Sequence, residues 1–366
     1  MHSAIATLYS VDYHKCCIIN HLSHVKQYSM TDNHVVLAAP YLLFLGDVRD
    51  VRYAKTASGL HYWRRNLCLA QSRLPGCVAD LGLPDLTPAE AAQRGVRSLI
   101  IGLAPAGGEI PASWLPVLED ALRAQLDVVS GMHLPLSSHP VLVDAARRSG
   151  SRLIDIRRAP ANLPIATGLR RTGKRLLTVG TDCGVGKKYA ALSIERELLS
   201  RGRNAHFRAT GQTGIMISGG GICIDAVISD FTAGAAETLS PNNSPDHWDI
   251  VEGQGSLFHP SYAGVSLSLL HGSQPDYLVI CHDAARTAIV GLPTYPVPSL
   301  TQCIEANIAA GRLVNPEVKV AGICVNTSSL NEADAHRHLR AATEETGLPA
   351  CDAVRTGVAA IVDRLS

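Results

Sequence analysis

The sequence has no excess of charge of either sign. Its 366 residues include 33 Lys and Arg against 32 Asp and Glu, which leaves a formal net charge of +1 at pH 7. Binding to a nucleic acid or to an anionic membrane depends on a basic surface, and this charge balance gives no reason to expect one. We therefore expect neither a nucleic acid nor a membrane among the partners of this protein.

Long apolar runs and export signals are also missing. The longest apolar stretch, residues 35–46, is too short to cross a bilayer and contains Pro40, so it is predicted to form a buried strand. The N-terminus shows neither a basic segment with a cleavage site nor a transit-peptide pattern. The ten cysteines are scattered, and several have apolar neighbours, as in reduced cytosolic proteins. These features predict a cytoplasmic globular protein.

The sequence lacks the regular Cys and His spacing of a metal site. One group near the N-terminus is close in sequence but has no second CxxC: His14, Cys16, Cys17, His21 and His24. We expect no metal there. The first thirty residues also show no helical or strand periodicity, and Met30 begins a stretch that looks like a natural start. Residues 1–36 are therefore expected to be a disordered leader or an artefact of the assigned gene start.

From about residue 37 the chain alternates between strand-like and helix-like segments. In the first part, apolar runs predict strands at 41–47, 97–108, 127–133 and 152–158. Helical spacing of apolar residues predicts helices at 111–126 and 140–150. Short strands separated by helices indicate a parallel sheet covered on both faces. Residues 37–160 are therefore predicted to form a small Rossmann-like α/β domain, and residues 159–174, rich in Pro, Gly and Arg, to form a linker.

The second part repeats this alternation. Strands are predicted at 175–180, 204–208, 248–252, 276–281 and 318–325. Helices are predicted at 187–201, 222–237, 298–311 and 331–345. The fold class is thus α/β, with a P-loop NTPase-like, doubly wound and mostly parallel sheet over residues 161–366 that follows the smaller Rossmann-like domain.

The strongest functional signal is the stretch GTDCGVGKK at residues 180–188, between a predicted strand and a predicted helix. Its glycines allow backbone N–H groups to converge on an anion at the helix N-terminus, and Lys187 adds a positive charge. This is the pattern of a phosphate-binding loop. The loop departs from the common pattern twice, with Thr181 at the position of the first glycine and Lys188 at the position of a Ser or Thr.

Lys188 stands where a nucleotide-hydrolysing loop needs a hydroxyl group to bind Mg²⁺, and a lysine cannot coordinate that ion. Two adjacent ammonium groups can instead hold a phosphate, at about 1.5–3 kcal/mol for each charge-assisted hydrogen bond. The loop therefore favours binding over hydrolysis. Coenzyme A is a ligand of this kind, because its reaction takes place at a distant thioester. The expected cofactor-binding residues are Gly180, Thr181, Asp182, Gly184, Val185, Gly186, Lys187, Lys188 and Asn326, whose amide can read a base edge.

Polar side chains follow several other strands, and the carboxyl ends of parallel strands meet at the edge of the sheet where ligands bind. Glu252 comes at the end of an apolar strand and before two small-residue turns, which expose its carboxylate, and His259 follows shortly after. Both are candidate catalytic residues. The other candidates, expected to contact the substrate, are Arg208, Thr210, Gln212, Asp230, Gln254, His282 and Arg286. For His282, a histidine satisfied within the core is an equally good interpretation.

Several long motifs resemble a bacterial and archaeal family whose characterised members are D-glutamate N-acetyltransferases. They are GTDCGVGKK, FRATGQTGIMI, SDFTAGAAE, EGQGSLFHPSYAGV and LLHGSQPDYLVICH. The resemblance covers about residues 40–366. More distantly, the P-loop part resembles dethiobiotin synthetase, in which a threonine follows the loop lysine. The Lys188 departure puts use of Mg-ATP in doubt.

The resemblance implies transfer of an acetyl group from acetyl-CoA to the amine of D-glutamate. It also implies a partner racemase for the product, N-acetyl-D-glutamate, and we expect a homo-oligomer. Glu252 or His259 would then remove a proton from the substrate ammonium, and Arg208 and Arg286 would bind its carboxylates through paired hydrogen bonds. Two alternatives stay open: an ATP-dependent carboxylate-activating ligase, and a nucleotide-sensing switch that is not an enzyme.

Overall fold

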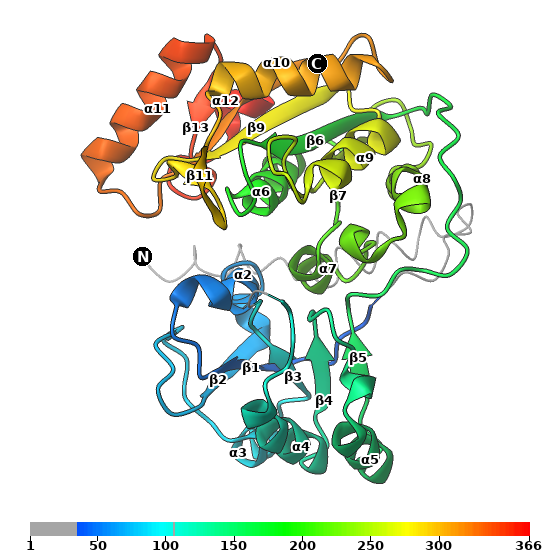
Figure 1. The fold of residues 1–366 in the computed structure, drawn as a ribbon, viewed down its shortest axis with the longest axis vertical. Coiled ribbons are helices and arrows are strands. Elements are labelled where there is room, and N and C mark those ends of the chain that lie inside the picture. The colour runs from blue at the N-terminus through cyan, green and yellow to red at the C-terminus, as the bar shows by residue number, and fades with distance from the viewer. Residues whose placement is uncertain (1–34, 105–106) are drawn as a thin grey trace, which may run out of the picture. The chain divides into compact units, whose positions relative to one another are not determined.

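Two parallel β-sheets, one after the other along the chain, form the framework of the computed structural model, which describes residues 35–104 and 107–366 (Figure 1). The described residues belong to one compact unit. The His and Cys residues near the N-terminus, and nearly all of the predicted leader, lie outside them. No helix in the described ranges is long and apolar enough to cross a membrane.

The first sheet has five strands in the order β2-β1-β3-β4-β5, and all neighbouring pairs are parallel. Its strands are β1 (Tyr41–Gly46), β2 (Cys68–Arg73), β3 (Ser98–Ile101), β4 (Asp127–Ser130) and β5 (Leu153–Asp155). All six residues of β1 are buried, as expected for a parallel strand that helices cover on both faces. Helix α2 (Lys55–Trp63) lies on one side, and α3 (Pro88–Gln93), α4 (Leu115–Arg123) and α5 (Pro140–Ser149) lie on the other (Figure 1).

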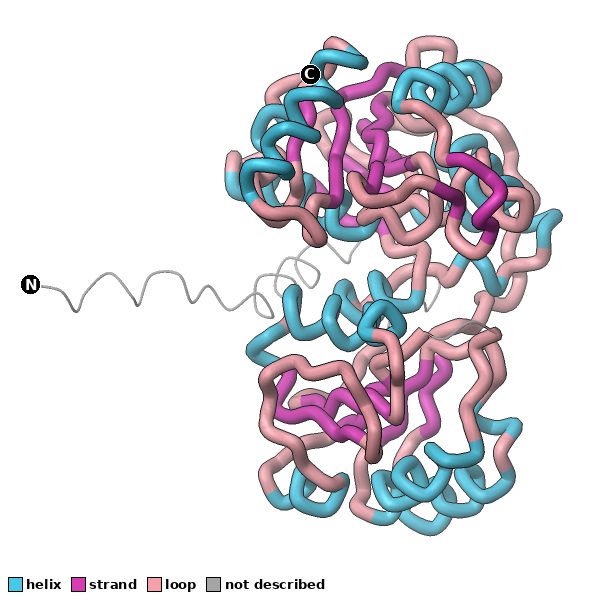
Figure 2. Tube along the Cα trace, turned by 60° about the vertical axis from the view of Figure 1, so that its left-hand side comes forward, coloured by secondary structure: helices cyan, strands magenta, loops and turns pink. Residues whose placement is uncertain are grey.

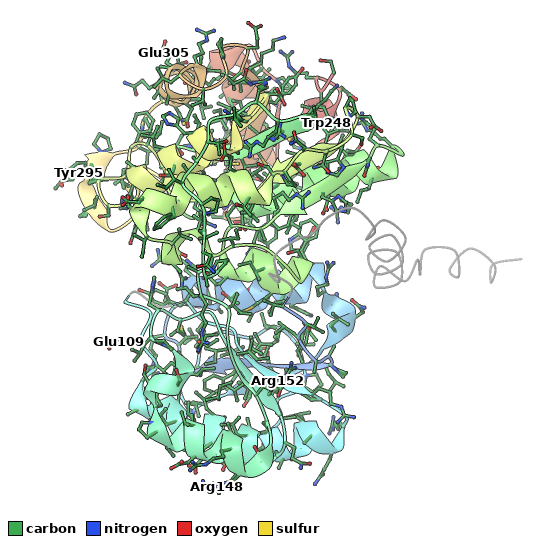
Figure 3. All side chains as sticks on the ribbon, turned by 90° about the vertical axis from the view of Figure 1, so that its right-hand side faces the viewer. Glu109, Arg148, Arg152, Trp248, Tyr295 and Glu305 are labelled. Carbon is green, nitrogen blue, oxygen red and sulfur yellow. The ribbon has the colours of Figure 1, made fainter. Side chains whose placement is uncertain are left out.

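The second sheet has six strands in the order β13-β12-β9-β6-β8-β7, again all parallel. They are β6 (Lys174–Gly180), β7 (Ala205–Arg208), β8 (Trp248–Val251), β9 (Tyr277–Asp283), β12 (Lys319–Asn326) and β13 (Ala350–Cys351). Figure 2 shows the strands of both sheets between their helices. Trp248, at the start of β8, is fully buried, with the charged ends of Lys174 and Arg203 5.3 Å and 5.0 Å from its ring centroid (Figure 3).

Two groups of helices cover this sheet. Helices α6 (Lys187–Ser200) and α12 (Ala359–Val362) contribute to one hydrophobic cluster. A separate cluster contains residues of α8 (Ser229–Leu239), α9 (Ala263–Ser273), α10 (Leu300–Arg312) and α11 (Glu332–Thr346). A short antiparallel hairpin, β10 (Ala288–Ile289) and β11 (Leu292–Pro296), follows β9, and Tyr295 points outward from it (Figure 3).

The predicted fold class is confirmed, and no helix or strand occupies residues 156–173 between the two sheets. The predicted helix at 222–237 is wrong at its start, because a 3₁₀ turn at Ile224–Ala226 precedes α8. Within the described ranges, sequence patterning also missed nine α-helices and strands: β2, β10, β11, β13, α2, α3, α7 (Gln212–Ser218), α9 and α12. Glycines explain the omission of α7, which lies between Gly211 and Gly219 and is only seven residues long.

Polar contacts join the first sheet's helix α2 to α7 of the second part of the chain. The hydroxyl oxygens of Thr56 and Thr213 lie 3.0 Å apart, and Arg64 Nε donates a 2.8 Å hydrogen bond to the Ile217 carbonyl. A second connection is the ion pair between Arg157 and Asp225. The contacts of Thr56 and Arg64 hold α2 against α7, a pairing that the sequence alone did not predict.

Candidate functional site

The predicted phosphate-binding loop connects the end of β6 to the start of α6. Gly184 and Gly186 have φ angles of +69° and +102°, a left-handed conformation that residues with a side chain rarely adopt. Thr181 is fully buried, and its hydroxyl lies 3.0 Å from His282 Nδ1. The loop thus has the backbone shape that an anion-binding turn requires.

The two adjacent lysines leave this loop in different directions. Lys187 is buried, and its Nζ donates a 2.8 Å hydrogen bond to the Asp182 carbonyl, within the loop itself. Lys188 is half-buried, and its Nζ lies next to helix α2, where a Cβ atom built on Gly59 would stand 2.9 Å from it. Successive residues on a helix do not share a face, which accounts for this divergence. Binding of one phosphate group by both lysines together therefore stays a prediction.

The environment of Lys188 changes its acid–base behaviour. Burial lowers the pKa of Lys188 to about 8, against an opposing effect of the Glu252 carboxylate, and the charge of Lys55 lowers it further. Its Nζ also lies 5.4 Å from the ring centroid of Tyr189. At physiological pH this ammonium group is thus closer to losing its proton than an exposed lysine would be.

Glu252 directly follows β8 and is buried at the edge of the sheet. Its Oε2 accepts hydrogen bonds of 3.0 Å from both the Thr210 and Gly211 backbone N–H groups. Burial raises the pKa of Glu252, while Lys188 and these hydrogen bonds counteract the rise. Gly253 is required next to it, because a Cβ atom there would stand 1.6 Å from the Thr178 carbonyl oxygen. A carboxyl group held in this way has the environment of a general base or acid.

The side chains of two predicted substrate-binding residues, Thr210 and Gln254, form a chain of hydrogen bonds that ends at the backbone carbonyl of Glu252. The Thr210 hydroxyl donates a 2.6 Å hydrogen bond to the Glu252 carbonyl, and Gln254 Nε2 donates one of 3.3 Å to that hydroxyl. A third, Gln212, is the first residue of α7 and packs against Gly131 at the end of β4. These three side chains gather around Glu252 and the α7 N-terminus.

His259 lies with Asp182 and Cys183 in a compact polar cluster, and their donor atoms are within 4.8 Å of one another. Asp182 and His259 already have polar partners within the protein. Asp182 Oδ2 accepts hydrogen bonds from Arg286 at 2.6 Å and from the Val290 N–H at 2.7 Å. His259 Nδ1 accepts one from the Ser261 N–H at 3.1 Å, and its Nε2 lies 3.3 Å from the Val290 carbonyl. The cluster therefore connects the phosphate-binding loop to the β10–β11 hairpin.

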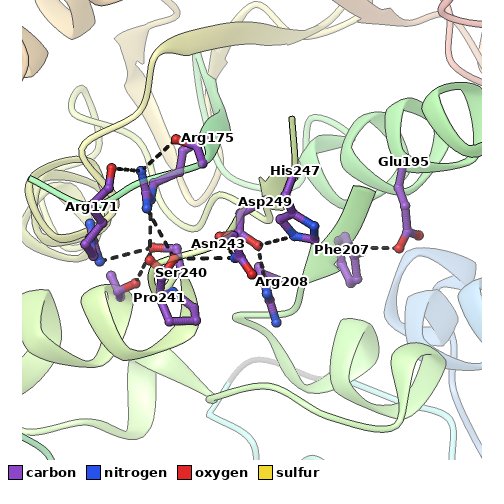
Figure 4. A network of polar contacts seen from close by, with 12 residues as sticks. Arg171, Arg175, Glu195, Phe207, Arg208, Ser240, Pro241, Asn243, His247 and Asp249 are labelled. Atoms are coloured by element: carbon purple, nitrogen blue, oxygen red, sulfur yellow. Dashed lines mark hydrogen bonds and ion pairs between the residues drawn. The ribbon is translucent and has the colours of Figure 1, made fainter. Parts of the chain in front are cut away.

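Arg208 takes part in a buried network that lies within the second sheet (Figure 4). Its Nε donates a 2.7 Å hydrogen bond to Asp249 Oδ1, which also lies 3.1 Å from His247 Nε2. Asn243 donates to the other oxygen of Asp249 at 3.2 Å. Burial alone would raise the pKa of Asp249, but the charge of Arg208 and the contact with His247 lower it below its ordinary value. The guanidinium group of Arg208 is thus neutralised inside the protein.

A pocket of about 480 Å³ is lined in part by His282 and Arg286, whose side chains contact Thr181 and Asp182 of the phosphate-binding loop. It is lined by the ends of β9 and β12, by the start of α10 and by α11, with both apolar and polar side chains. The polar lining residues are His282, Arg286, Thr287, Ser299, His338 and Glu345. Arg286 belongs both to this pocket and to the loop, since it is bonded to Asp182. The pocket therefore lies beside the predicted anion site, and Arg286 contacts both.

Asn326 and Asp230 are the remaining predicted site residues. Asn326 Nδ2 donates a 3.1 Å hydrogen bond to Asp283 Oδ2, its Oδ1 accepts one from the Ser328 N–H, and its Cβ is close to Gly186. Its amide group is thus held by neighbouring loops beside the phosphate-binding loop. Asp230 is exposed in the first turn of α8 and makes no contact with the groups above that the structure records.

Sequence reasoning missed Lys55, Gly59 and Cys183. Cys183 stands inside the quoted loop motif and could have been recognised there. Lys55 and Gly59 carry no local signal, because they lie on a helix that was not predicted and reach the site only through the packing of α2 against α7.

Comparisons with known proteins give a consistent result. Residues 164–362 match a family model described as a P-loop domain of unknown function, DUF1611_C, and residues 72–159 match a Rossmann-like domain of unknown function, DUF1611_N. A D-glutamate N-acetyltransferase from Tritonibacter scottomollicae is 47% identical over 331 residues, which cover 90% of this chain and 99% of that protein. One from a Pseudoalteromonas species is 46% identical, with 89% of this chain and 98% of that protein covered.

One solved structure is also similar over most of the chain. The crystal structure of a DUF1611 family protein from Anabaena variabilis matches with a TM-score of 0.81 and 33% identity. The match covers 89% of this chain and 99% of that one. The arrangement of both sheets is therefore a feature shared with this structure.

Proposed function

This chain belongs to the DUF1611 family, and from the activity named for its two bacterial relatives we propose that it is a D-glutamate N-acetyltransferase. The observation that carries this proposal is the likeness to those relatives over almost the whole length of both chains. The phosphate-binding loop without a metal-binding hydroxyl and the buried carboxyl group of Glu252 support it.

We propose acetyl-CoA as the acetyl donor. The phosphate-binding loop supplies backbone N–H groups and the charge of Lys187 for the diphosphate of this molecule. The adjoining pocket of about 480 Å³ has the size and the mixed lining of a small-molecule site, and it suits the adenosine end. Arg286, which lines the pocket, lies 4.0 Å from where a Cβ atom on Gly184 would stand, so one ligand could extend from the loop into the pocket.

In the proposed reaction, the neutral amine of D-glutamate attacks the thioester carbonyl of acetyl-CoA. A new C–N bond forms, the C–S bond breaks, and coenzyme A leaves as its thiol. Only the unprotonated amine can attack, so a base must first accept a proton from the substrate ammonium. Glu252 is our candidate for this base because its raised pKa makes proton transfer less unfavourable. His259 is the alternative, although its two ring nitrogens already face the Ser261 N–H and the Val290 carbonyl.

The product of this reaction, N-acetyl-D-glutamate, would be a suitable substrate for a racemase that acts on N-acetylated amino acids. We include such a racemase, and a homo-oligomeric state of the protein, in the proposal.

The test is to incubate the purified protein with acetyl-CoA and a panel of D- and L-amino acids and to measure free thiol. We expect thiol release with D-glutamate above the background rate of thioester hydrolysis, and N-acetyl-D-glutamate by mass spectrometry. Release of ADP from Mg-ATP with a small carboxylic acid, and none of thiol from acetyl-CoA, would instead support a carboxylate-activating ligase.

A further inference from the structure

D-glutamate carries two carboxylates, so a site for it needs positive charge that the protein has not already neutralised. Both arginines expected for this role are already paired. Arg208 is bonded to Asp249, and Arg286 is bonded to Asp182. Lys187 stays within the loop, bonded to the Asp182 carbonyl, and its charge is already assigned to the donor diphosphate. The charges still available near Glu252 must therefore come from other residues.

Lys188 is one such charge. Within the described part of the chain, its Nζ has no recorded hydrogen bond to a protein group and no ion pair with a carboxylate. The ammonium group lies against Gly59 of α2, as does the methyl group of Thr213 of α7, since a Cβ atom on Gly59 would be 2.9 Å from Lys188 Nζ and 3.0 Å from Thr213 Cγ2. Glu252 is close enough for the two charges to affect each other.

Lys55 is the second charge. It is the first residue of α2, one helical turn before Gly59, so the two residues share the helix face that meets Lys188. Its side chain is exposed, and among described residues it too has no recorded hydrogen bond or ion pair. Its charge acts on Lys188 and on Cys183 of the phosphate-binding loop. The two positive charges repel each other, and an anion bound between them would remove this repulsion.

Lysine is rare in this protein, which has seven in 366 residues. Three of the five in the described ranges, Lys55, Lys187 and Lys188, lie around the phosphate-binding loop. An ordinary solvated surface does not explain this concentration, because the surface ion pairs of the described residues use arginine and not lysine.

We propose that Lys55 and Lys188 bind a carboxylate of the amino acid substrate and thereby hold its amine next to Glu252. This inference rests on the proposed function and gives the first domain a role in it, as the source of one substrate ligand and of the glycine that makes room for the other. A carboxylate fits better than a phosphate of the donor because Lys188 acts beside the candidate base, where the amino group must be.

The test compares Lys55→Met with Lys319→Met, a matched change of an exposed lysine at the start of β12. Loss of one charge-assisted hydrogen bond predicts a KM for D-glutamate about 10- to 100-fold higher in Lys55→Met. The KM for acetyl-CoA should not change, and Lys55→Arg should restore most of the affinity. Lys319→Met should behave as the wild type. Melting temperatures check that all variants are folded.

Isothermal titration with N-acetyl-D-glutamate gives a readout that does not depend on turnover. We expect weaker binding in Lys55→Met and in Lys188→Met, but not in Lys319→Met. Titrations with N-acetyl-D-glutamine and N-acetyl-D-isoglutamine, each with one carboxylate replaced by an amide, identify the carboxylate involved. One of the two amides lacks the carboxylate that the lysines bind. For that amide, the wild type and the lysine variants should have the same affinity.

Two results would overturn the proposal. One is an unchanged affinity for N-acetyl-D-glutamate in both Lys55→Met and Lys188→Met. The other is an increased KM for acetyl-CoA alone, which would assign these lysines to the donor phosphates. Failure of the proposed function is a different result, because the wild type would then release no thiol with D-glutamate under any condition.

Discussion

The ammonium group of Lys188 lies against Gly59, so closely that a Cβ atom on this glycine would stand 2.9 Å from Nζ. Lys188 follows the phosphate-binding lysine, whereas Gly59 belongs to a helix of the first sheet. The contact means that a residue in each half of the chain determines where one charge of the site is placed. It also changes the interpretation of the second loop lysine, whose ammonium group turns to α2 while that of Lys187 stays in the loop.

The first prediction concerns Gly59→Ala. The added methyl group must displace the end of a flexible lysine side chain and the Thr213 methyl group, which costs little stability. Alanine also favours the helix by about 1 kcal/mol relative to glycine. We expect a melting temperature within a few degrees of the wild type, together with a clearly increased KM for D-glutamate. Thermal unfolding and steady-state kinetics measure the two effects.

The neighbouring substitution Ser58→Ala is a suitable control, because Ser58 is exposed on the same helix. It should leave both stability and KM unchanged. An equal KM in Gly59→Ala and the wild type would show that the position of Lys188 does not matter for substrate binding.

The second prediction is a pH dependence of ligand binding. Because the pKa of Lys188 is lowered to about 8, its positive charge is present below this pH and is lost above it. The charged or titratable groups recorded around it are Lys55, Glu252 and Tyr189. Affinity for N-acetyl-D-glutamate, which has no titrating amine, should fall as the pH increases from 7 to 9. Isothermal titration in Lys188→Arg should show a smaller fall, because arginine stays charged.

The third prediction separates catalysis from stability at Glu252. Glu252→Gln should abolish turnover and leave binding of coenzyme A largely intact, because the amide oxygen can still accept the two backbone hydrogen bonds. The folded protein raises the pKa of this carboxyl group, so its stabilising contribution is fully present below the unfolded pKa and is lost as the pH increases through the folded pKa. Removal of the charge should therefore leave the melting temperature at pH 8 equal to or above that of the wild type. Thiol release, calorimetry and thermal unfolding provide the three measurements, and loss of coenzyme A binding alone would remove Glu252 from the role of base.

The sequence predicted the parts of the fold that repeat a local pattern. The buried strand β1 is an apolar run, the strand before the phosphate-binding loop contains the apolar residues Leu176, Leu177 and Val179, and α5 ends at Gly150 in a left-handed conformation. The loop itself was recognisable because its glycines are required by backbone conformation rather than by distant contacts. These features depend on neighbouring residues only.

The parts that sequence reasoning missed depend on contacts between distant residues. Arg208 ends a strand just before a glycine-rich stretch, as a ligand-binding residue would, but its partner Asp249 is 41 positions away. Lys55 reaches the loop only because Thr56 and Thr213, 157 positions apart, bring two helices together. Residue type and spacing contain no information about either pairing, so a search for charged residues at strand ends selects Arg208 and passes over Lys55.

The fourth prediction tests the structural role of the Arg208 and Asp249 pair. Asp249→Asn leaves a mostly buried guanidinium group without its charged partner, which should lower the free energy of unfolding at pH 7 by about 3 kcal/mol. The folded protein lowers the pKa of Asp249, so the stabilising effect is present above the unfolded pKa and disappears as the pH falls through the folded pKa. Urea unfolding at pH 7 and at lower pH should therefore show that the difference in free energy of unfolding between the wild type and Asp249→Asn becomes smaller in acid.

The exposed Asp246→Asn is the control for this pair, and it should change stability by less than about 0.5 kcal/mol. An equally small effect of Asp249→Asn would contradict the structural role of the pair.

The fifth prediction uses Cys183 as a reporter of the phosphate-binding loop. This thiol is half-buried; burial raises its pKa, an effect that Lys187 and Lys55 counteract, so slow alkylation is best followed near pH 8.5. If the loop holds the phosphates of coenzyme A, a concentration about 100 times Kd should slow alkylation of Cys183 about 100-fold, since only the unliganded fraction reacts. Cys77, which is also half-buried but lies after β2 in the first sheet, should react at the same rate with and without coenzyme A. Peptide mass spectrometry resolves the two sites, and unprotected labelling of Cys183 in the presence of saturating coenzyme A would place the donor phosphates elsewhere.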